Sequence, residues 1–480
     1  MNFNTKLSFM SDEQKALMLD RVFTLLGVNG ARLDHPFVLE ILAEAGADVD
    51  KNTKIVRFPK EFLEKVIKGS PKSAFHAGVI EENDFEVPRA DGLFITRSGT
   101  GAPFFMDPET GKKTTVTIEN VKTWVKVVDS LPDIDFCPFP SPSDIKPQVA
   151  DIEAIHATFN TTGKHVWTQP YSDGSIEYLI RMAEVVAGGR EELKKRPVLS
   201  LITCSLTPLD FKHMDLDIIV QAAPLGLPLH LCSLPSAGTT APFTTGGVVL
   251  LAAAEILVMM SVTQTIAPGA PMVATPLIFA SDMSTGGSLQ SSMEAIIGKA
   301  TAIEFVKWAY GIPAHTYGFG SDTVIPDEQA AAESAMLASI ISHVGGDILG
   351  GAGQLEVATI ASPVQLIMDD EIAGSLRRIQ GGVNLDDDYM AWDLLQEASF
   401  ESQFLSSKHT FKHCREALKT KNFSRKTFDG WEAAGKKTQK ERAYEKYHQI
   451  MAAEPKQYIS AEQVKELKSV LDDSIEKLVK

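Results

Sequence analysis

The chain has 480 residues, of which 44% are hydrophobic and 22% are charged; this composition excludes disorder, collagen and coiled coil as the main architecture. The formal net charge of −16 is unevenly distributed, because residues 411–480 carry 16 Lys and Arg against 11 Asp and Glu, whereas the rest of the chain carries 30 against 51. The excess of negative charge in residues 1–410 repels phosphate groups, and we therefore expect no nucleic-acid partner.

The first 90 residues predict a mainly helical N-terminal cap. Ser11 and the Asp-Glu-Gln that follows it indicate a helix start, and apolar residues recur at a spacing near 3.6 through 22–28 and 36–47. Residues 51–58 and 84–106 look like short strands around turns. We therefore treat residues 1–90 as a cap on the domain that follows and not as an independent domain.

From residue 92, strand-like segments alternate with helical ones. Such alternation predicts parallel β–α–β units, and eight units fit a TIM (β/α)8 barrel, whose core is typically ~250 residues. We place the barrel at residues 91–385 and a helical extension, packed on the barrel, at 386–480. The predicted strands lie in 92–107, 134–141, 165–172, 198–205, 229–236, 272–281, 314–321 and 345–351.

The longest apolar run, residues 246–262, contains Glu255 and is short for a membrane span, so it predicts a buried helix. No apolar signal segment follows Met1. The four cysteines form no CxxC pair and fit a reducing compartment. We expect a cytoplasmic protein with no membrane contact.

The predicted strands run into loops rich in Gly, Pro, Ser and Thr, where barrel enzymes bind their substrates; such residues also suit any β–α turn. No P-loop, GxGxxG, HExxH or GxSxG motif is present. His165, His230, His315 and His343 lie near strand ends, but no cluster has metal-ligand spacing. We therefore expect no bound metal, and we interpret Cys204 and Cys232 as buried thiols.

Aromatic residues gather near the same predicted loops. Each ring alone is more typical of core packing, but a box of rings binds a quaternary ammonium through cation–π attraction. Alternation along a strand places Trp167, Gln169 and Tyr171 on one side of their strand, and Tyr317 and Phe319 on one side of theirs. With Phe94, these residues are the candidate ammonium site.

Several long segments resemble the trimethylamine methyltransferase family. They are residues 309–349 (AYGIPAHTYGFGSDTVIPDEQAAAESAMLASIISHVGGDIL), 362–379 (SPVQLIMDDEIAGSLRRI) and 290–305 (QSSMEAIIGKATAIEF). The resemblance implies a TIM barrel, in agreement with the strand count. It also implies transfer of a methyl group from an amine to the Co(I) of a corrinoid carried by a separate small protein.

The founding trimethylamine enzymes of the family contain pyrrolysine, whereas this chain contains only the standard twenty residues. It therefore resembles the non-pyrrolysine members, which act on quaternary amines. Glycine betaine is our first choice, and proline betaine, carnitine and γ-butyrobetaine are the alternatives. Demethylation of a quaternary amine expels a neutral amine, so neither a general acid nor a covalent adduct is needed.

A betaine is a zwitterion, so its site needs groups for both ends. Asp322 and Glu356 are the candidate acids near the ammonium, although loop capping explains them equally well. His343 is the candidate donor near the carboxylate, and capping of a helix C-terminus is its alternative role. His230 is a further candidate substrate-binding residue.

Two other functions stay open. One is a barrel lyase or hydrolase with His343 or His230 as general base. The other is a soluble betaine-binding protein without catalysis. A barrel of this size is also expected to form a homo-oligomer.

Overall fold

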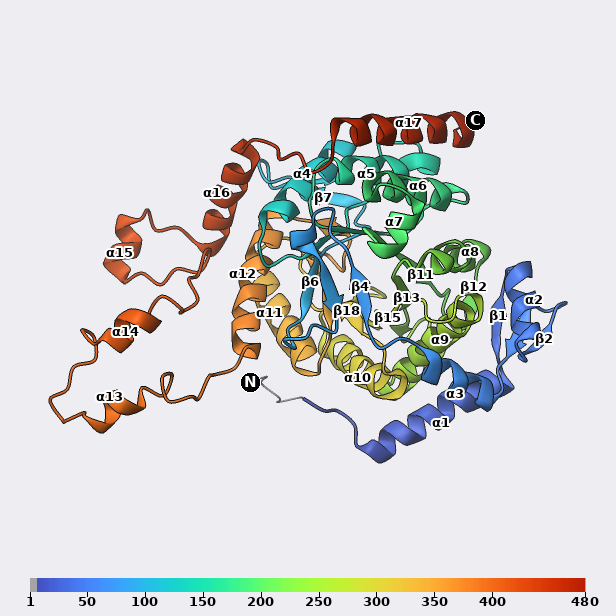
Figure 1. Cartoon of the computed structure of the whole chain (residues 1–480), viewed down its shortest axis with the longest axis horizontal. Helices are drawn as coiled ribbons and strands as arrows, with labels where there is room; N and C mark the ends of the chain where they lie inside the picture. The colour runs from blue at the N-terminus through green and yellow to red at the C-terminus, as the bar shows by residue number, and fades with distance from the viewer. Residues whose placement is uncertain (1–6, 480) are drawn as a thin grey trace.

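A computed structural model describes residues 7–479, and eight parallel strands form a barrel at its centre (Figure 1). Each of the first six strands pairs with its neighbour along the chain, and the eighth strand pairs with the seventh and with the first. A bridge between Ala274 and Ala314 joins the sixth strand to the seventh and completes the circle. The strands overlap the eight predicted segments, so the prediction of a TIM barrel is confirmed. They are β6 (Ile95–Ser98), β9 (Phe136–Cys137), β10 (His165–Thr168), β11 (Leu199–Cys204), β13 (Leu229–Ser233), β15 (Met272–Pro276), β18 (His315–Tyr317) and β19 (Ile348–Ala352).

One long helix follows each barrel strand, and together these helices form the outer layer (Figure 1). The outward side chains of the strands and the inward faces of the helices form the main hydrophobic core. The helices are α4 (Ile118–Ser130), α5 (Ala150–Phe159), α6 (Ser175–Ala187), α8 (His213–Ala222), α9 (Thr245–Ile266), α10 (Met293–Tyr310), α11 (Glu328–His343) and α12 (Pro363–Gln380), with a short α7 (Arg190–Lys195) after α6.

The apolar run of residues 246–262 lies within α9, which is long and apolar enough to cross a membrane. However, 78% of its most apolar window is buried inside the protein, as predicted for a core helix. Glu255 is the only charged residue in α9, and it is fully buried. Its carboxylate accepts hydrogen bonds from Ser205 Oγ (2.5 Å), Ser233 Oγ (2.5 Å) and Leu209 N (2.8 Å), and so fixes the ends of β11 and β13.

The N-terminal region contains α1 (Asp12–Val28), α2 (Pro36–Glu44) and α3 (Lys60–Gly69). It also contains a small sheet, in the order β12-β1-β3-β2, of which only β3 was predicted. Strand β12 belongs to the loop after β11 and so joins this sheet to the barrel. The Arg32 guanidinium donates two hydrogen bonds to the Asp210 carboxylate of β12, of 3.0 and 2.5 Å. The strands are β1 (Ala31–Leu33), β2 (Asp48–Asp50), β3 (Ile55–Arg57) and β12 (Asp210–Phe211).

A hairpin closes the N-terminal end of the barrel. Its strands are β4 (Ala74–His76) and β5 (Phe85–Val87). The His76 ring stacks on Phe85 and lies 4.9 Å from the ring of His165, at the start of β10. Because Ala74, Phe85 and Val87 belong to the same buried cluster as the inward barrel residues, the hairpin fills this opening.

Short strands surround the opposite end, where the barrel strands terminate; we call this end the mouth. They belong to loops that follow individual barrel strands. These strands are β7 (Phe104–Met106), β8 (Lys113–Thr115), β14 (Ser236–Ala237), β16 (Phe279–Ser281), β17 (Ser288–Leu289), β20 (Gln354–Leu355) and β21 (Ile360–Ala361).

The C-terminal extension has two parts. Helix α16 (Gln439–Ala452) packs on α12 and α4, and α17 (Ala461–Leu478) packs on α6 and α5. Residues 383–437 instead project from the body as an arm, which carries α13 (Trp392–Gln396), α14 (Lys408–His413) and α15 (Phe428–Ala433) (Figure 1). None of these three short helices has a buried residue.

Candidate active site

Arg97 lies inside the barrel, and the sequence analysis missed it. Alternation along β6 turns Ile95 and Arg97 inward, and the guanidinium is fully buried. Its Nε donates to His315 Nε2 at 2.8 Å, and its Nη1 donates to the Ser98 carbonyl at 2.9 Å. A β-carbon at Gly350 would lie 2.7 Å from the guanidinium, so the glycine of β19 makes room for it.

This arginine has no counter-ion among the described residues. None of the ion pairs within 7–479 includes Arg97, and its Nη2 is buried without a hydrogen-bond partner. Burial lowers the pKa of Arg97, but an arginine stays charged in proteins. A buried charge without compensation costs several kcal/mol. Such a group is typical of a site where an anionic ligand supplies the second charge.

Two aromatic rings enclose the guanidinium. Its Cζ lies 4.6 Å from the Trp167 ring centroid and 5.5 Å from that of Tyr317. Both residues point into the barrel, as predicted. However, these rings were predicted to bind the substrate ammonium, and that prediction needs correction. The Arg97 guanidinium already lies against both rings and would repel a second cation placed there.

Hydrogen bonding assigns the protons of the neighbouring histidines. His315 Nε2 accepts from Arg97, so its proton is on Nδ1, which lies 3.2 Å from His230 Nδ1. His230 therefore accepts at Nδ1 and carries its proton on Nε2, which is buried without a partner. Burial lowers the pKa of both histidines well below the usual value, so both rings are neutral.

Three donors inside the barrel thus lack acceptors: Arg97 Nη2, Trp167 Nε1 and His230 Nε2. Their side chains touch, since the Trp167 and His230 ring centroids are 5.7 Å apart. Most buried polar groups in proteins are paired. Three donors without acceptors in one cluster indicate the site of an acceptor-rich ligand, and a carboxylate is the simplest such group.

Two glutamines above this cluster also have unmatched atoms. Gln354 Oε1 and both amide atoms of Gln290 are buried without partners. Gly351 lies between Gln354 and Tyr317, because a β-carbon there would lie 2.7 Å from the Tyr317 ring and 3.3 Å from Gln354 Oε1. The glycine-rich end of β19 therefore makes space for polar side chains, and no phosphate-binding motif is needed to explain it.

A second buried cation, Lys299 of α10, lies beside this region. Its Nζ donates to the Gln290 carbonyl and lies 5.8 Å from the Phe279 ring and 5.9 Å from the Tyr317 ring. Burial lowers the pKa of Lys299 to about 7. Unlike Arg97, this side chain can therefore lose its proton near neutral pH.

A cavity of about 530 Å³ opens at the mouth. Phe279 lines it and contacts Tyr317 edge to face at 6.0 Å, so the cavity adjoins the ring that contacts Arg97. Glu356 lies in its wall and pairs with Lys113. The other lining residues are Phe104, Lys113, Ser288, Val357 and Thr359.

The turn beside this cavity has an uncommon backbone. Glu356, Val357 and Ala358 all have positive φ, at 48°, 53° and 66°. The left-handed conformation costs a non-glycine residue roughly 1–2 kcal/mol, and consecutive examples are typical of functional sites. Ala358 packs against the interior cluster, so the strained turn covers part of the mouth.

Two predicted aromatic residues point away from the interior. Phe94 precedes the inward Ile95, faces the outer helices and lies under Arg377, at 5.2 Å. Phe319 is also in the outer core. The amides of Gly318 and Phe319 both donate to the Gly350 carbonyl, so the alternation stops after Tyr317. Their assignment to the ammonium site was wrong.

His343 was expected near the mouth, and this expectation was wrong. It ends α11 and precedes β19, so it lies at the opposite end of the barrel. Its Nδ1 lies 2.6 Å from the Ser339 carbonyl one turn earlier, as in the capping alternative. Asp322 accepts from the amides of Gln290 (2.8 Å) and Ser291 (3.0 Å), which is also a capping role.

Gln169 and Tyr171 lie beyond the end of β10 and are partly exposed. The Tyr171 hydroxyl accepts from Ser141 Oγ at 2.9 Å, and its amide donates to Asp151 at 2.8 Å. Tyr171 thus joins two loops of the mouth, and neither side chain contacts Arg97 through a hydrogen bond.

The sequence profile of the family described as Trimethylamine methyltransferase (MTTB) matches residues 2–477. The chain is 28% identical to a trimethylamine methyltransferase, MttB, of Desulfitobacterium hafniense, over 93% of this chain and 89% of the relative. It is 27% identical to a glycine betaine methyltransferase of the same species, over 93% of each protein. The solved structure of the Methanosarcina barkeri monomethylamine methyltransferase is similar in fold, with a TM-score of 0.52 and 13% identity, covering 100% of this chain and 89% of that one.

Proposed function

Because this chain belongs to the trimethylamine methyltransferase family, we propose that it demethylates a quaternary amine that carries a carboxylate, with glycine betaine as the first choice. The methyl acceptor in this proposal is the Co(I) of a corrinoid carried by a separate small protein. The observation that carries the choice of substrate is the buried, unpaired Arg97 and the acceptor-free donors beside it.

The proposed reaction is an in-line displacement. The bond between a methyl carbon and nitrogen breaks, its electron pair stays on nitrogen, and a neutral tertiary amine leaves. The electron pair of Co(I) forms the new bond to the methyl carbon. Since the nitrogen is already positively charged, the protein needs no acid to activate the leaving group. Its residues have to orient the amine and keep water away.

The interior suits one orientation of such a zwitterion. The carboxylate would lie on Arg97, with further hydrogen bonds from Trp167 Nε1 and His230 Nε2. The ammonium would then point toward the mouth, near the Glu356 carboxylate in the wall of the cavity, where a methyl group faces the incoming acceptor. The reverse orientation would place the ammonium beside Arg97 and leave the carboxylate near Glu356, and both contacts would be repulsive.

Trimethylamine lacks a group that could pair with Arg97, so we expect it to be a poor substrate. Carnitine, γ-butyrobetaine and proline betaine also carry a carboxylate, and differ in the distance between their charged ends. The 27% identity with a glycine betaine methyltransferase supports the smallest of them. The buried state of Arg97 favours the same choice, because a short molecule reaches it with least rearrangement.

The test is a spectral assay. The protein is mixed with reduced cob(I)alamin and one methyl donor, and formation of methylcob(III)alamin is followed. We expect transfer from glycine betaine and none from trimethylamine. Tetramethylammonium, a quaternary amine without a carboxylate, should react at least ~10-fold more slowly than glycine betaine at low concentration. Equal rates for these two donors, or robust transfer from trimethylamine, would contradict the proposal.

A further inference from the structure

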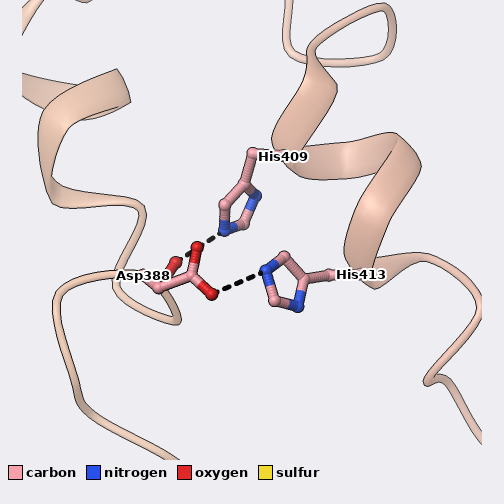
Figure 2. Close-up of side chains that lie close together, drawn as sticks. All are labelled: Asp388, His409 and His413. Atoms are coloured by element: carbon pink, nitrogen blue, oxygen red, sulfur yellow. Dashed lines mark hydrogen bonds and ion pairs between the residues drawn. The ribbon is translucent and has the colours of Figure 1, made fainter.

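Three potential metal ligands come together in the arm (Figure 2). His409 and His413 lie one turn apart on α14, so their rings project from one side of the helix. Asp388 approaches them from the segment that precedes α13. One ligand atom of each residue lies within 4.8 Å of the others. Within residues 7–479, this is the one group of at least three His, Cys, Asp or Glu residues with this property.

The prediction of no bound metal rested on histidines near strand ends, and this group lies far from any barrel strand. The signal was present in the H-x-x-x-H spacing of residues 409–413, which places two imidazoles on one helix face. The third residue is 21 positions before His409, so only the fold brings it close.

The surroundings of His413 match those of a metal-binding imidazole. Its Nδ1 lies 3.0 Å from Glu416 Oε1, and its Nε2 lies 3.4 Å from Asp388 Oδ2 without forming a hydrogen bond. With the proton on Nδ1, the Nε2 lone pair faces a carboxylate oxygen, and this contact becomes favourable when Nε2 binds a metal ion or a second proton. A carboxylate on the other ring nitrogen is the usual outer partner of a metal-bound histidine.

The Asp388 carboxylate already attracts cations. Lys412 Nζ donates to its Oδ2 at 2.6 Å, and His409 Nε2 lies 2.8 Å from the Asp388 carbonyl (Figure 2 shows the Asp388 and histidine contacts). The Lys412 ammonium therefore binds the same carboxylate oxygen, Asp388 Oδ2, that a metal ion would bind, and the two cations would compete for it.

The arm also needs a stabilising element other than a core. Its helices bury no residue, and several large apolar side chains are exposed: Phe400 at 112%, Leu405 at 89% and Phe411 at 67%. A segment that buries so little is typically held by a disulfide, a metal or a partner. A metal bound by Asp388, His409 and His413 would close the segment between them and restrict the unfolded arm.

We propose that Asp388, His409 and His413 form a site for one transition-metal ion, Zn²⁺ by preference, which holds the arm together. Two imidazoles and a carboxylate suit Zn²⁺, with water as the fourth ligand. Glu416 acts as a positioning residue through His413. The site lies outside the barrel and is independent of the proposed methyl transfer.

The experiment titrates metal-free, full-length protein with ZnCl₂ by calorimetry. We expect one Zn²⁺ per chain, and binding at least ~10-fold weaker in the His409→Ala/His413→Ala double variant. His448→Ala is the matched control, because His448 is also a partly exposed histidine of the C-terminal region but lies outside the site; its titration should equal that of the native protein. Circular dichroism checks that each variant retains its fold.

Two further variants separate a metal site from a network of ion pairs. Glu416→Gln should weaken Zn²⁺ binding roughly 10-fold or more, and Lys412→Gln should strengthen it, because a competing cation is removed. Zn²⁺ should also slow proteolysis of the arm in the native protein and have no effect in the double variant. Absence of stoichiometric Zn²⁺ binding, or equal affinity in the native protein and the double variant, would overturn the proposal.

Discussion

The barrel interior and the C-terminal arm depart from the usual distribution of side chains in opposite directions. The interior buries polar atoms that have no partner, including Arg97 Nη2 and His230 Nε2, whereas the arm exposes large apolar side chains such as Phe400 and Leu405. Both departures indicate an absent contact. The two observations tell us different things. The unmatched donors indicate which chemical groups a ligand must have, whereas the exposed apolar side chains show only that the arm lacks a core of its own.

The largest expected effect tests the interior. Arg97→Met removes the charge and the unmatched donors but keeps an apolar side chain of similar length. Loss of one partner of a buried charge pair costs ~2–5 kcal/mol, so kcat/KM for glycine betaine should fall by roughly 30- to 5000-fold. Steady-state kinetics with cob(I)alamin measures kcat/KM. The value for Arg97→Lys should lie between those of the native protein and Arg97→Met, because lysine keeps the charge but lacks the planar guanidinium.

Tetramethylammonium provides the control for this variant. It cannot pair with Arg97, so Arg97→Met should react with it at least as fast as the native protein does. If Arg97→Met instead lowers the rates with both donors equally, the arginine supports the barrel and does not recognise the substrate.

The second prediction concerns Lys299. Its pKa is lowered from 10.5 to about 7 in the folded state, so between these values the unfolded state binds more protons. The free energy of unfolding should therefore rise with pH over that range, by up to ~1.4 kcal/mol per pH unit. Below about pH 7 both states are protonated, so this rise with pH should disappear and the destabilisation by the buried ammonium should be constant. Urea unfolding at about pH 6, 7.5 and 9 should show the rise in the native protein relative to Lys299→Met. Parallel pH profiles of the two proteins would contradict it.

The third prediction decides what the aromatic rings recognise. Trp167→Leu removes a ring that stacks on Arg97, and a desolvated cation–π contact contributes up to ~2 kcal/mol. We expect the Kd for glycine betaine to rise about tenfold. The carboxylate analogue with a tert-butyl group in place of trimethylammonium should lose as much affinity, because the ring acts through Arg97. A loss confined to glycine betaine would restore the ammonium cage that the sequence suggested.

A smaller effect is expected at the mouth. Glu356 lies in the wall of the cavity but is partly exposed and already paired with Lys113, so its attraction for an ammonium is screened. Glu356→Gln should raise KM for glycine betaine by about 2- to 5-fold. His343→Ala, at the other end of the barrel, should leave KM unchanged; a comparable increase in that variant would show that the change at Glu356 is not local.

The smallest effect is expected in the arm. Phe400→Ser and Leu405→Ser remove exposed apolar side chains that contribute little to the core, so each should change the free energy of unfolding by less than ~0.5 kcal/mol. Thermal unfolding measures the change. A substantial loss of stability would mean that these side chains are covered in solution by another surface, and gel filtration would then show whether a second copy provides it.

The sequence predicted the barrel well, because each strand is a short apolar run that ends in turn residues. The three-residue strands β1 and β2 were missed because they are too short to show alternation. Alternation also placed Trp167 and Tyr317 correctly, but it failed for Phe319, where two successive amides share one carbonyl. His343 was misplaced for a topological reason, since the residue before a barrel strand lies at the end opposite the mouth.

Arg97 shows the limit of sequence reasoning most clearly. An arginine inside the segment FITRSG is compatible with an exposed strand end, and nothing near it in the chain indicates burial. Its proposed role rests on the absence of a carboxylate partner among all the described residues, which is a property of the assembled barrel. The importance of Gly350 and Gly351 is likewise visible only in the assembled barrel, where they leave space for side chains from other strands.

The hairpin of β4 and β5 has a kinetic consequence. Because it fills one end of the barrel, the amine and the corrinoid protein of the proposed reaction would share the entrance at the mouth. The amine would then have to enter first, since the docked partner would block its path, and the demethylated amine would leave only after the partner departs. The proposed reaction should therefore follow a compulsory order through a ternary complex. With the natural partner protein, the tertiary amine product should be a competitive inhibitor with respect to the betaine. With respect to the corrinoid protein, its inhibition should not be competitive.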